Sequence, residues 1–406
     1  MTINKEAIRN TAPGLHQSMI DFAQKLVRAR SDTGHEKEVA ELIMAECQTL
    51  GYDEVIQDTT GNIIAILHGD GSGKNLMLNC HMDQVDPGDL DAWEYPPFGG
   101  EIHDGYLHGR GASDTKGAIA TQVYAGALLK KMDLHLKGDC IFTFVVEEEP
   151  GDMWGAIQMY REVLKDRRID FCISGEATGM GIALGHRGKL ELEIISKGKN
   201  SHSSAPWLGI NAVSKMAPMI TEINRMAGTL PKDDLFQDSL SIIAIHCHPG
   251  FNCVVPDTCT IHVDYRFSTD ETAEDILGKF RKIADKLEKE DPQSSFEVRI
   301  RQLEHTSYRG VHDFAELNKP CFVTDLQNAY VQRVIHALGI MDQQPKTYYW
   351  DFGTDAAFFA SACKIPAIGY SPLEEQYCHA PVDRVNLDLM KQALEGYAAI
   401  CMDIVC

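Results

Sequence analysis

A short segment, Asn79-Cys80-His81-Met82-Asp83, decides how the rest of the chain is interpreted. It follows the apolar run Leu76-Met77-Leu78, which predicts a short buried strand. His81 and Asp83 are two residues apart, so on an extended segment their side chains point to the same face. A metal-binding histidine usually gives its second ring N–H to a carboxylate, and this pair fits that arrangement. Taken alone, such a pair more often marks a core histidine beside a turn aspartate.

Composition narrows the class of protein. The chain has 406 residues, of which 44% are hydrophobic and 24% charged, enough for two or three globular domains. Its net charge of −21 disfavours nucleic acid or an anionic membrane surface as a partner. No apolar run reaches the length of a membrane span, and the first residues lack the apolar core of a secretion signal. The 12 scattered cysteines contain no C-x-x-C pair, so we expect free thiols and a cytoplasmic protein.

The first part of the chain alternates between helical and strand patterns. The strand at 139–146 is apolar throughout, as in a parallel sheet that is covered on both faces. This alternation predicts a three-layer α/β domain. The spacing predicts helices over 15–27, 36–50 and 118–132, and strands over 55–56, 62–67, 76–78, 139–146 and 170–173.

A different pattern begins after Gly185. The order strand, helix, strand, strand, helix, strand is that of a ferredoxin-like split unit. The helical and apolar strand patterns of the first part resume at 328–338 and near Ala367, so this unit looks inserted. We therefore expect a catalytic domain made of 1–185 and 302–406, and an inserted α+β domain over 186–301. The expected inserted elements are strands 189–195, 241–246, 258–267 and 296–300 and helices 211–226 and 272–287.

Carboxylates follow two of the predicted strands. Glu147, Glu148 and Glu149 end the strand at 139–146, and Glu176 follows the strand at 170–173. Ligands of open α/β sheets bind at the carboxyl ends of the strands. Three adjacent carboxylates there repel one another, so they indicate either a solvated turn or a bound cation.

A glycine-rich loop, Gly109 to Gly117, precedes the helix at 118–132. Such a loop can bind phosphate at a helix N-terminus, but this one contains no Walker-type G-K-[ST] motif. We expect its glycines to let the backbone approach a site closely. Asp114 then stands at the helix entrance, where it fits a helix cap as well as a ligand.

The loop from Asp86 to Gly100 is long and contains Trp93 and Phe98. Long loops in compact domains are often functional. Pinning by aromatic packing is an equally good interpretation.

Histidines and carboxylates at these positions form a mixed nitrogen and oxygen donor set that suits zinc, cobalt or manganese. Glu148, left without a ligand role, fits a general base for metal-assisted hydrolysis. The five predicted metal ligands are His81, Asp114, Glu149, Glu176 and His379.

Almost the whole chain resembles the dinuclear zinc amidohydrolases that include aminoacylase, acetylornithine deacetylase, succinyl-diaminopimelate desuccinylase and glutamate carboxypeptidase. Within that family the pattern is most similar to bacterial hydrolases linked to selenium metabolism. The resemblance implies a zinc-exopeptidase-like catalytic domain and a ferredoxin-like lid through which two subunits pair. It rests on His81-Met82-Asp83, the loop Gly109–Gly117, Glu148-Glu149 with Gly151, Gly175-Glu176, Asn200-Ser201-His202-Ser203 and His379.

The resemblance also implies roles for the ligands. His81, Asp114 and Glu176 would hold one ion, and Asp114 would bridge to a second ion held with Glu149 and His379. Asp83 would orient His81, and Glu148 would be the base for a water that bridges the metals. The family pattern Asp-Glu-Glu stands here as Glu147-Glu148-Glu149, and its Glu-Pro as Glu176-Ala177. We assign the glutamates by counting back from Gly151.

Four further positions follow from the same resemblance. His202 would reach the partner's site and stabilise the oxyanion, and Arg266 would grip a substrate carboxylate. Asn252 and Thr354 are the other expected substrate-binding residues. From the residues alone, His202 fits a polar surface position and Arg266 a surface salt bridge on a strand.

The expected function is metal-dependent hydrolysis of an amide bond, either in an N-acyl amino acid or at the end of a short peptide. An N-carbamoyl amidohydrolase or a dipeptidase would use the same site. A non-catalytic binding or regulatory relative is the alternative from another class, and the complete ligand set with Glu148 argues against it.

Overall fold

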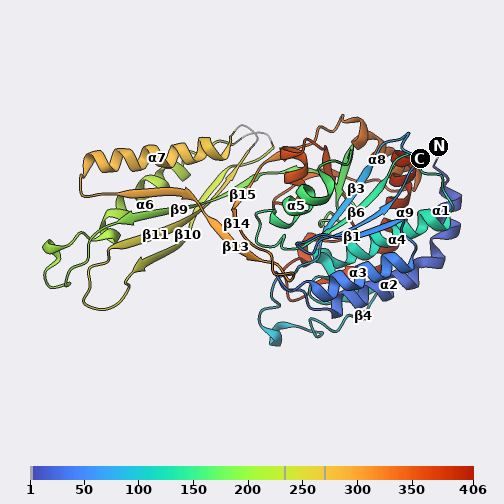
Figure 1. Cartoon of the computed structure of the whole chain (residues 1–406), viewed down its shortest axis with the longest axis horizontal. Helices are drawn as coiled ribbons and strands as arrows, with labels where there is room; N and C mark the ends of the chain where they lie inside the picture. The colour runs from blue at the N-terminus through green and yellow to red at the C-terminus, as the bar shows by residue number, and fades with distance from the viewer. Residues whose placement is uncertain (1–2, 233–234, 269–270) are drawn as a thin grey trace.

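The computed structural model describes residues 3–232, 235–268 and 271–406, which form two lobes along the long axis of the molecule (Figure 1). The larger lobe is built on a nine-stranded mixed sheet and carries both chain termini. The smaller lobe is built on a five-stranded sheet. The polypeptide enters the smaller lobe through β9 and returns after β12, as expected for an inserted unit.

The sheet of the larger lobe has the order β1-β2-β6-β3-β7-β18-β8-β16, and β17 pairs with β8. The central strands β6, β3, β7 and β18 are parallel, and β17 is parallel to β8. The pairs β1-β2, β2-β6, β18-β8 and β8-β16 are antiparallel. The apolar strand at 139–146 therefore indicated a covered sheet correctly, but the sheet is mixed. The strands are β1 (Glu54–Gln57), β2 (Ile63–Leu67), β3 (Leu76–His81), β6 (Cys140–Val145), β7 (Phe171–Ser174), β8 (Ile182–His186), β16 (Phe322–Val323), β17 (Thr347–Trp350) and β18 (Ala367–Gly369).

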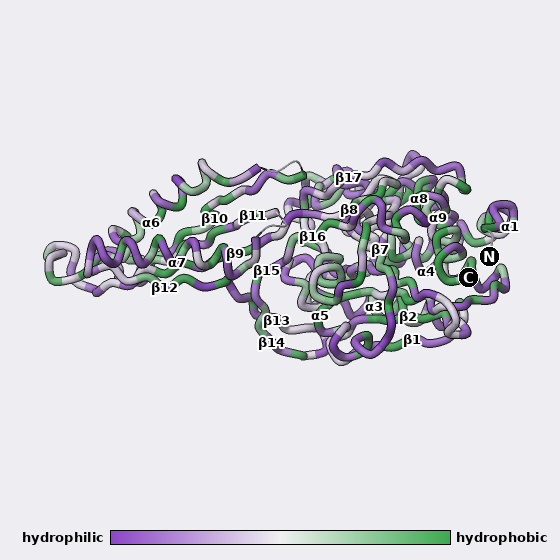
Figure 2. Tube along the Cα trace, turned by 90° about the horizontal axis from the view of Figure 1, so that it is seen from above, coloured by the Kyte–Doolittle hydropathy of each residue, from purple (hydrophilic) through white to green (hydrophobic). Residues whose placement is uncertain are grey.

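Each central strand buries both of its faces, which confirms the three-layer α/β fold. In β2, Ile63 and Ala65 face one hydrophobic core, whereas Ile64 and Ile66 face the other. Figure 2 shows the hydrophobic trace gathered in the interior of this lobe. One face is covered by α2 (Pro13–Arg28), α3 (Lys37–Thr49), α4 (Gly117–Lys131), α8 (Ala329–Ile340) and α9 (Leu387–Val405), and the other by α5 (Trp154–Met159) and the helical turns at 160–164 and 358–362.

The smaller lobe has the predicted β-α-β-β-α-β order. Its strands lie in the order β10-β11-β9-β12, and alternate residues of β9, such as Leu190 and Leu192, pack against the helices. A capping box between Thr272 and Asp275 begins the second helix. The elements are β9 (Gly188–Lys197), α6 (Ala212–Ala227), β10 (Ser239–His248), β11 (Thr258–Phe267), α7 (Ala273–Glu290) and β12 (Phe296–Ile300).

The return segment from the smaller lobe contains elements that the sequence did not reveal. A hairpin of β13 (Gln302–Thr306) and β14 (His312–Glu316) crosses to the larger lobe. At its turn, the Tyr308 hydroxyl donates to the Gly61 carbonyl at 2.6 Å. The chain then comes back to β9 through β15 (Asn318–Lys319). The predicted domain boundaries at 185/186 and 301/302 stay predictions.

A small third sheet joins distant parts of the larger lobe. It has the order β19-β5-β4, with β4 (Glu101–His103), β5 (Tyr106–His108) and β19 (Arg384–Asn386). This pairing places the segment after His379 beside the glycine-rich loop. Among the residues that the structure describes, no helix combines the length and apolarity needed to cross a bilayer.

Candidate active site

His81 ends β3 at the carboxyl edge of the parallel strands. Its Nδ1 lies 3.0 Å from the Asp83 carbonyl oxygen and 3.4 Å from the Asp83 carboxylate. The same carboxylate accepts the backbone N–H groups of Glu148 at 3.0 Å and Glu149 at 3.1 Å, and the Thr33 hydroxyl at 2.9 Å. Asp83 therefore ties the end of β3 to the glutamate turn that follows β6.

Asp114 lies in the glycine-rich loop and does not cap the next helix, whose first flanking residue is Lys116. Its carboxylate instead faces His81, with Asp114 Oδ1 2.9 Å from His81 Nε2. The buried Asp383 holds the loop by accepting the N–H groups of Gly111 and Ser113, both at 2.8 Å. Burial raises the pKa of the Asp383 carboxyl to about 7.

His379 lies in the segment before β19 and meets the same carboxylate. Its Nε2 lies 3.0 Å from Asp114 Oδ2 and 3.1 Å from Glu149 Oε2. Asp114 thus lies between the two histidines, one on each oxygen. This is the position expected of a bridging ligand.

Glu176 completes the set from the end of β7, with its Oε1 3.7 Å from His81 Nε2. Two trios of ligand atoms each lie within 4.8 Å of one another: His81 with Asp114 and Glu149, and His81 with Glu148 and Glu176. The structure therefore brings all five predicted ligands together. It also places Glu148 near enough to Glu176 to share a cation with it.

The donor set fits divalent metal ions. Burial raises the pKa of Glu149 to about 7 and that of Glu176 well above its usual range. Among the residues that the structure describes, the buried Glu149 Oε1 has no hydrogen-bond partner. Hydrogen bonds to Asp114 and Glu149 raise the pKa of His379 to about 10. Buried carboxylates that repel one another and draw protons onto neighbouring imidazoles are stabilised when a cation binds between them.

Glu147 points away from this cluster. Its Oε2 lies 2.6 Å from Nδ1 of His305, a buried residue of β13 whose Nε2 lies 2.5 Å from Asp152 Oδ2. The His305 ring also stacks on Trp154 at 4.8 Å between centroids. The structure thus separates the first glutamate of the turn from the two that face the pocket, which supports the assignment made by counting back from Gly151.

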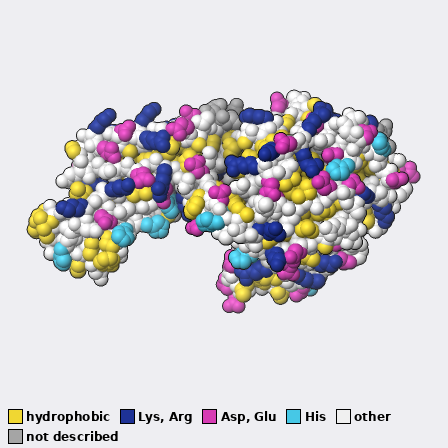
Figure 3. Space-filling view, viewed as in Figure 1, with side chains coloured by type: hydrophobic (Ala, Val, Ile, Leu, Met, Phe, Trp, Pro, Cys, Tyr) yellow, Lys and Arg dark blue, Asp and Glu magenta, His cyan; other side chains and the backbone are white. Residues whose placement is uncertain are grey.

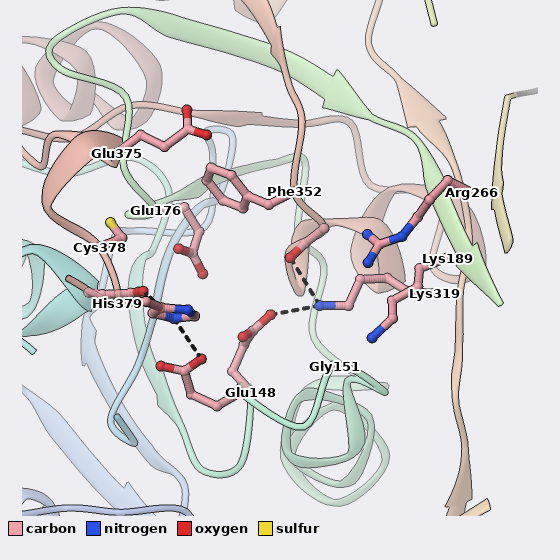
Figure 4. A pocket seen from close by; sticks show the side chains of 13 residues that line it. Glu148, Gly151, Glu176, Lys189, Arg266, Lys319, Phe352, Glu375, Cys378 and His379 are labelled. Atoms are coloured by element: carbon pink, nitrogen blue, oxygen red, sulfur yellow. Dashed lines mark hydrogen bonds and ion pairs between the residues drawn. The ribbon is translucent and has the colours of Figure 1, made fainter. Parts of the chain in front are cut away.

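A pocket of about 350 Å³ opens beside the cluster, between the two lobes. Glu148 lies in its wall, where Oε1 accepts a hydrogen bond from the buried Lys319 ammonium at 2.7 Å (Figure 4). Lys319 also donates to the Gly353 carbonyl at 3.2 Å. The pocket is lined by Asp114, Glu148, Glu149, Gly151, Glu176, Lys189, Arg266, Lys319, Phe352, Gly353, Glu375, Cys378 and His379.

Of the predicted substrate-binding residues Arg266 and Thr354, only Arg266 lines the pocket. Arg266 lines the pocket from β11, while its guanidinium also makes two hydrogen bonds to Asp264 at 2.7 and 3.0 Å. Thr354 follows the pocket-lining Gly353, but its side chain is fully buried. Its backbone N–H donates to His186 Nε2 at 3.0 Å. Within the described residues, Thr354 is not part of the pocket wall.

His202 and Asn252 lie far from the pocket of their own chain. Lys189 is near the pocket end of β9 and Lys197 is at the other end, a rise of roughly 25 Å at about 3.3 Å per residue. His202 follows Lys197, and a bridge pairs it with Val254 beside Asn252. Both side chains are exposed.

The loop at 86–100 is pinned by aromatic contacts. The Arg110 guanidinium lies 5.0 Å from the Trp93 ring centroid, and the Arg30 guanidinium lies 5.3 Å from that of Phe98. Trp93 Nε1 donates to the Pro87 carbonyl at 3.0 Å. These contacts support the packing interpretation of the loop.

Three residues of the site region were missed from the sequence. Lys319, Asp383 and His305 act through contacts with residues more than a hundred positions away. Asp383 lies four residues after His379 in the same loop, which was the one available signal. Nothing in the local sequence marks Lys319 or His305.

Comparison with known proteins agrees with this geometry. The sequence matches peptidase family M20/M25/M40 over residues 77–403. The chain belongs to this family. The predicted family is confirmed, and membership makes the protein a hydrolase that acts on peptide or amide bonds. The selenium-linked subgroup stays a prediction.

The relatives are similar along their whole length. The uncharacterised protein YgeY of Escherichia coli (strain K12) is 28% identical over 396 residues, which cover 97% of this chain and 96% of YgeY. A putative aminohydrolase from methicillin resistant Staphylococcus aureus has a TM-score of 0.77 at 17% identity, covering 99% of this chain and 100% of that one. The Bacillus subtilis YXEP protein, a dinuclear metal binding peptidase from the M20 family, has a TM-score of 0.71 at 15% identity, with 97% and 99% covered. These structural similarities confirm the fold.

Proposed function

We propose that the protein is a metal-dependent amide hydrolase that deacylates N-acyl amino acids or removes a terminal residue from short peptides. The position of Glu148 carries this proposal. Its backbone N–H is fixed by Asp83 at 3.0 Å, and Lys319 holds one carboxylate oxygen at 2.7 Å. The second oxygen is left to accept a proton beside the predicted ligands.

By the predicted ligand sets, one ion would be held by His81, Asp114 and Glu176. The other would be held by Glu149 and His379 together with the same Asp114. Zinc is the ion we expect, and cobalt and manganese suit the same donors. When bound, such ions supply the Lewis acidity that activates water and polarises the scissile carbonyl. Glu148 takes the proton of the attacking water and delivers it to the leaving amine. Arg266 binds a substrate carboxylate at the opposite wall of the pocket.

We propose further that two chains pair through the smaller lobe, so that His202 and Asn252 enter the partner's site. β10 is an edge strand, and Ile243 and Ile245 on it are 52% and 54% exposed. Figure 3 shows hydrophobic side chains at the outer end of this lobe. Trp207, Leu208 and Phe251, in the segments that follow β9 and β10, are also exposed. A second copy of the chain would bury these surfaces.

The pocket volume of about 350 Å³ is near the lower limit for small-molecule sites, which supports a small substrate. All 12 cysteines are free thiols, which supports the cytoplasmic location.

The test compares Glu148→Gln with Glu147→Gln. Each variant is assayed with zinc, cobalt or manganese on N-acyl amino acids, N-carbamoyl amino acids and dipeptides, and its metal content is measured by elemental analysis. We expect Glu148→Gln to retain two ions per chain and lose activity by at least about 10²-fold to 10⁴-fold. Glu147→Gln should remain active. If Glu147→Gln is inactive and Glu148→Gln is active, the general base is Glu147 and not Glu148. If the wild type binds a single ion at saturation, the proposed dinuclear centre is refuted.

A further inference from the structure

Three basic side chains stand in one row across neighbouring strands of the five-stranded sheet in the smaller lobe. Arg266 of β11 is directly opposite Lys189 of β9, and Lys189 is directly opposite Lys319 of β15. The adjacent Leu190 and Tyr265 are buried against the helices, so the row faces the other side of the sheet. There all three basic residues line the pocket. Like charges directly opposite one another destabilise a sheet, so the row requires a reason beyond folding.

The next row of the same face is acidic. Glu191 is directly opposite Asp264. Glu191 forms an ion pair with Lys189, and Asp264 forms one with Arg266. Asp264 takes both hydrogen bonds from Arg266, whereas Glu191 is shared. Its Oε1 lies 2.9 Å from Lys189 Nζ, and its Oε2 accepts from Arg301 at 2.7 Å. Burial raises the pKa of Glu191, but Lys189 and Arg301 outweigh that effect and lower it. Arg266, Lys189, Lys319 and Arg301 thus face three carboxylates, Asp264, Glu191 and Glu148, which leaves one net positive charge in this region.

The cations of the row have different tasks. Lys319 is occupied by Glu148 and by the Gly353 carbonyl. Lys189 has no such engagement with the catalytic carboxylates and extends toward Gly151, 3.6 Å from the point where a Cβ on that glycine would lie. Figure 4 shows Arg266 and Lys189 on one side of the pocket and Glu176 and His379 on the other. A substrate whose amide lies at Glu148 presents its far end to Arg266 and Lys189.

We propose that the substrate carries two acidic groups on this side, one bound by Arg266 and the other by Lys189. N-acyl derivatives of aspartate and glutamate, and dipeptides that contain them, have this chemistry. The inference rests on the proposed function, because the amide at Glu148 sets which part of the substrate reaches the row. Arg266 and Lys189 stand on separate strands and pair with different carboxylates of the acidic row, so each has further N–H donors to offer to a separate anion.

The experiment uses substrate pairs of equal shape that differ in one charge. These are N-acetyl-glutamate against N-acetyl-glutamine and N-acetyl-aspartate against N-acetyl-asparagine, together with the corresponding N-carbamoyl amino acids and glycyl dipeptides. With the metal-loaded wild type we expect kcat/KM to favour the acid by at least about tenfold, the factor that 1.4 kcal/mol supplies. Lys189→Met should reduce kcat/KM for the acid and leave the amide nearly unchanged. Lys197→Met is the matched control, because Lys197 lies on the same strand but is 57% exposed and outside the pocket.

A binding measurement separates this inference from the proposed function. Glutarate and its monoamide are titrated calorimetrically into metal-loaded wild type, Lys189→Met and Lys197→Met. We expect glutarate to bind more tightly than the monoamide, and only Lys189→Met to remove the difference. Equal binding of the two compounds by wild type, or equal kcat/KM on acid and amide, overturns the inference while hydrolysis itself can stand. If no amide in the panel is hydrolysed, the proposed function fails and the titration still decides the role of Lys189.

Discussion

Replacing His305 with glutamine should weaken the fold to an extent that depends on pH. The imidazole is 2% exposed and lies between two carboxylates, at 2.6 Å from Glu147 and 2.5 Å from Asp152. Burial lowers the pKa of His305, but the hydrogen bonds to Asp152 and Glu147 outweigh it and raise the pKa from 6.5 to about 9. The imidazole is therefore a cation in the folded protein at neutral pH.

The size of the expected stability loss follows from the pKa shift of His305. One pKa unit corresponds to about 1.4 kcal/mol, so the rise to about 9 stabilises the fold by about 3 kcal/mol. Because the pKa of the folded state is the higher one, this contribution is fully present below pH 6.5. It declines as pH rises through 9, where the folded protein also loses the proton. The loss on replacing His305 should therefore be about 3 kcal/mol near pH 6 and close to zero from this source at pH 9.5.

The free energy of unfolding is measured by urea titration followed by tryptophan fluorescence, because Trp154 stacks on His305. Wild type and His305→Gln are compared at pH 6.0, 7.5 and 9.5, with chelator in every sample so that metal binding does not contribute. His312→Gln is the control, since His312 lies in the same hairpin but is 51% exposed. A free-energy difference between wild type and His305→Gln that stays constant from pH 6.0 to 9.5 would show that His305 is not charged in the fold.

Three other predictions concern contacts that the structure shows. Lys319→Met should lower kcat by about 10-fold to 100-fold, because Glu148 loses a charge-assisted hydrogen bond worth about 1.5–3 kcal/mol, with metal content unchanged. Gly61→Ala should destabilise the protein by about 1–3 kcal/mol in urea unfolding, since the new Cβ would lie 2.4 Å from the Tyr308 ring; an unchanged midpoint would contradict this packing. Mixing inactive His202→Ala and Glu148→Gln chains should restore part of the activity if sites are shared. No recovery after verified subunit exchange would argue that each chain works alone.

The fold was largely predictable because periodicity reports burial. The apolar patterns at 15–27 and 36–50 correspond to α2 and α3, and the order of the inserted unit is the predicted one. Strand direction was less accessible, since an apolar strand is buried on both faces in a mixed sheet as well as in a parallel one. The hairpin at 302–316 was not predicted, because it is stabilised by contacts to the larger lobe rather than by a pattern of its own.

The gathering of the predicted metal ligands was predictable for a related reason. His81 ends a strand and Glu149 and Glu176 follow strands, so the topology alone gathers them at one edge of the sheet. Lys319 and His305 have no such marker, because each meets its partner across more than 150 residues of chain. A cationic row is likewise invisible until the register of the strands is known.

The return segment shows why the inserted lobe matters within a single chain. It carries His305, which holds Glu147 on one side of the catalytic turn, and Lys319, which holds Glu148 on the other. Lys319 is placed by pairing with Lys189 of β9, a strand of the inserted lobe. A chain without that lobe would keep every predicted metal ligand. It would lose β9, the strand that positions Lys319 beside Glu148. If Glu148 is the base, as proposed, the inserted lobe would support the reaction from within the same chain, separately from the role proposed for His202 across a dimer.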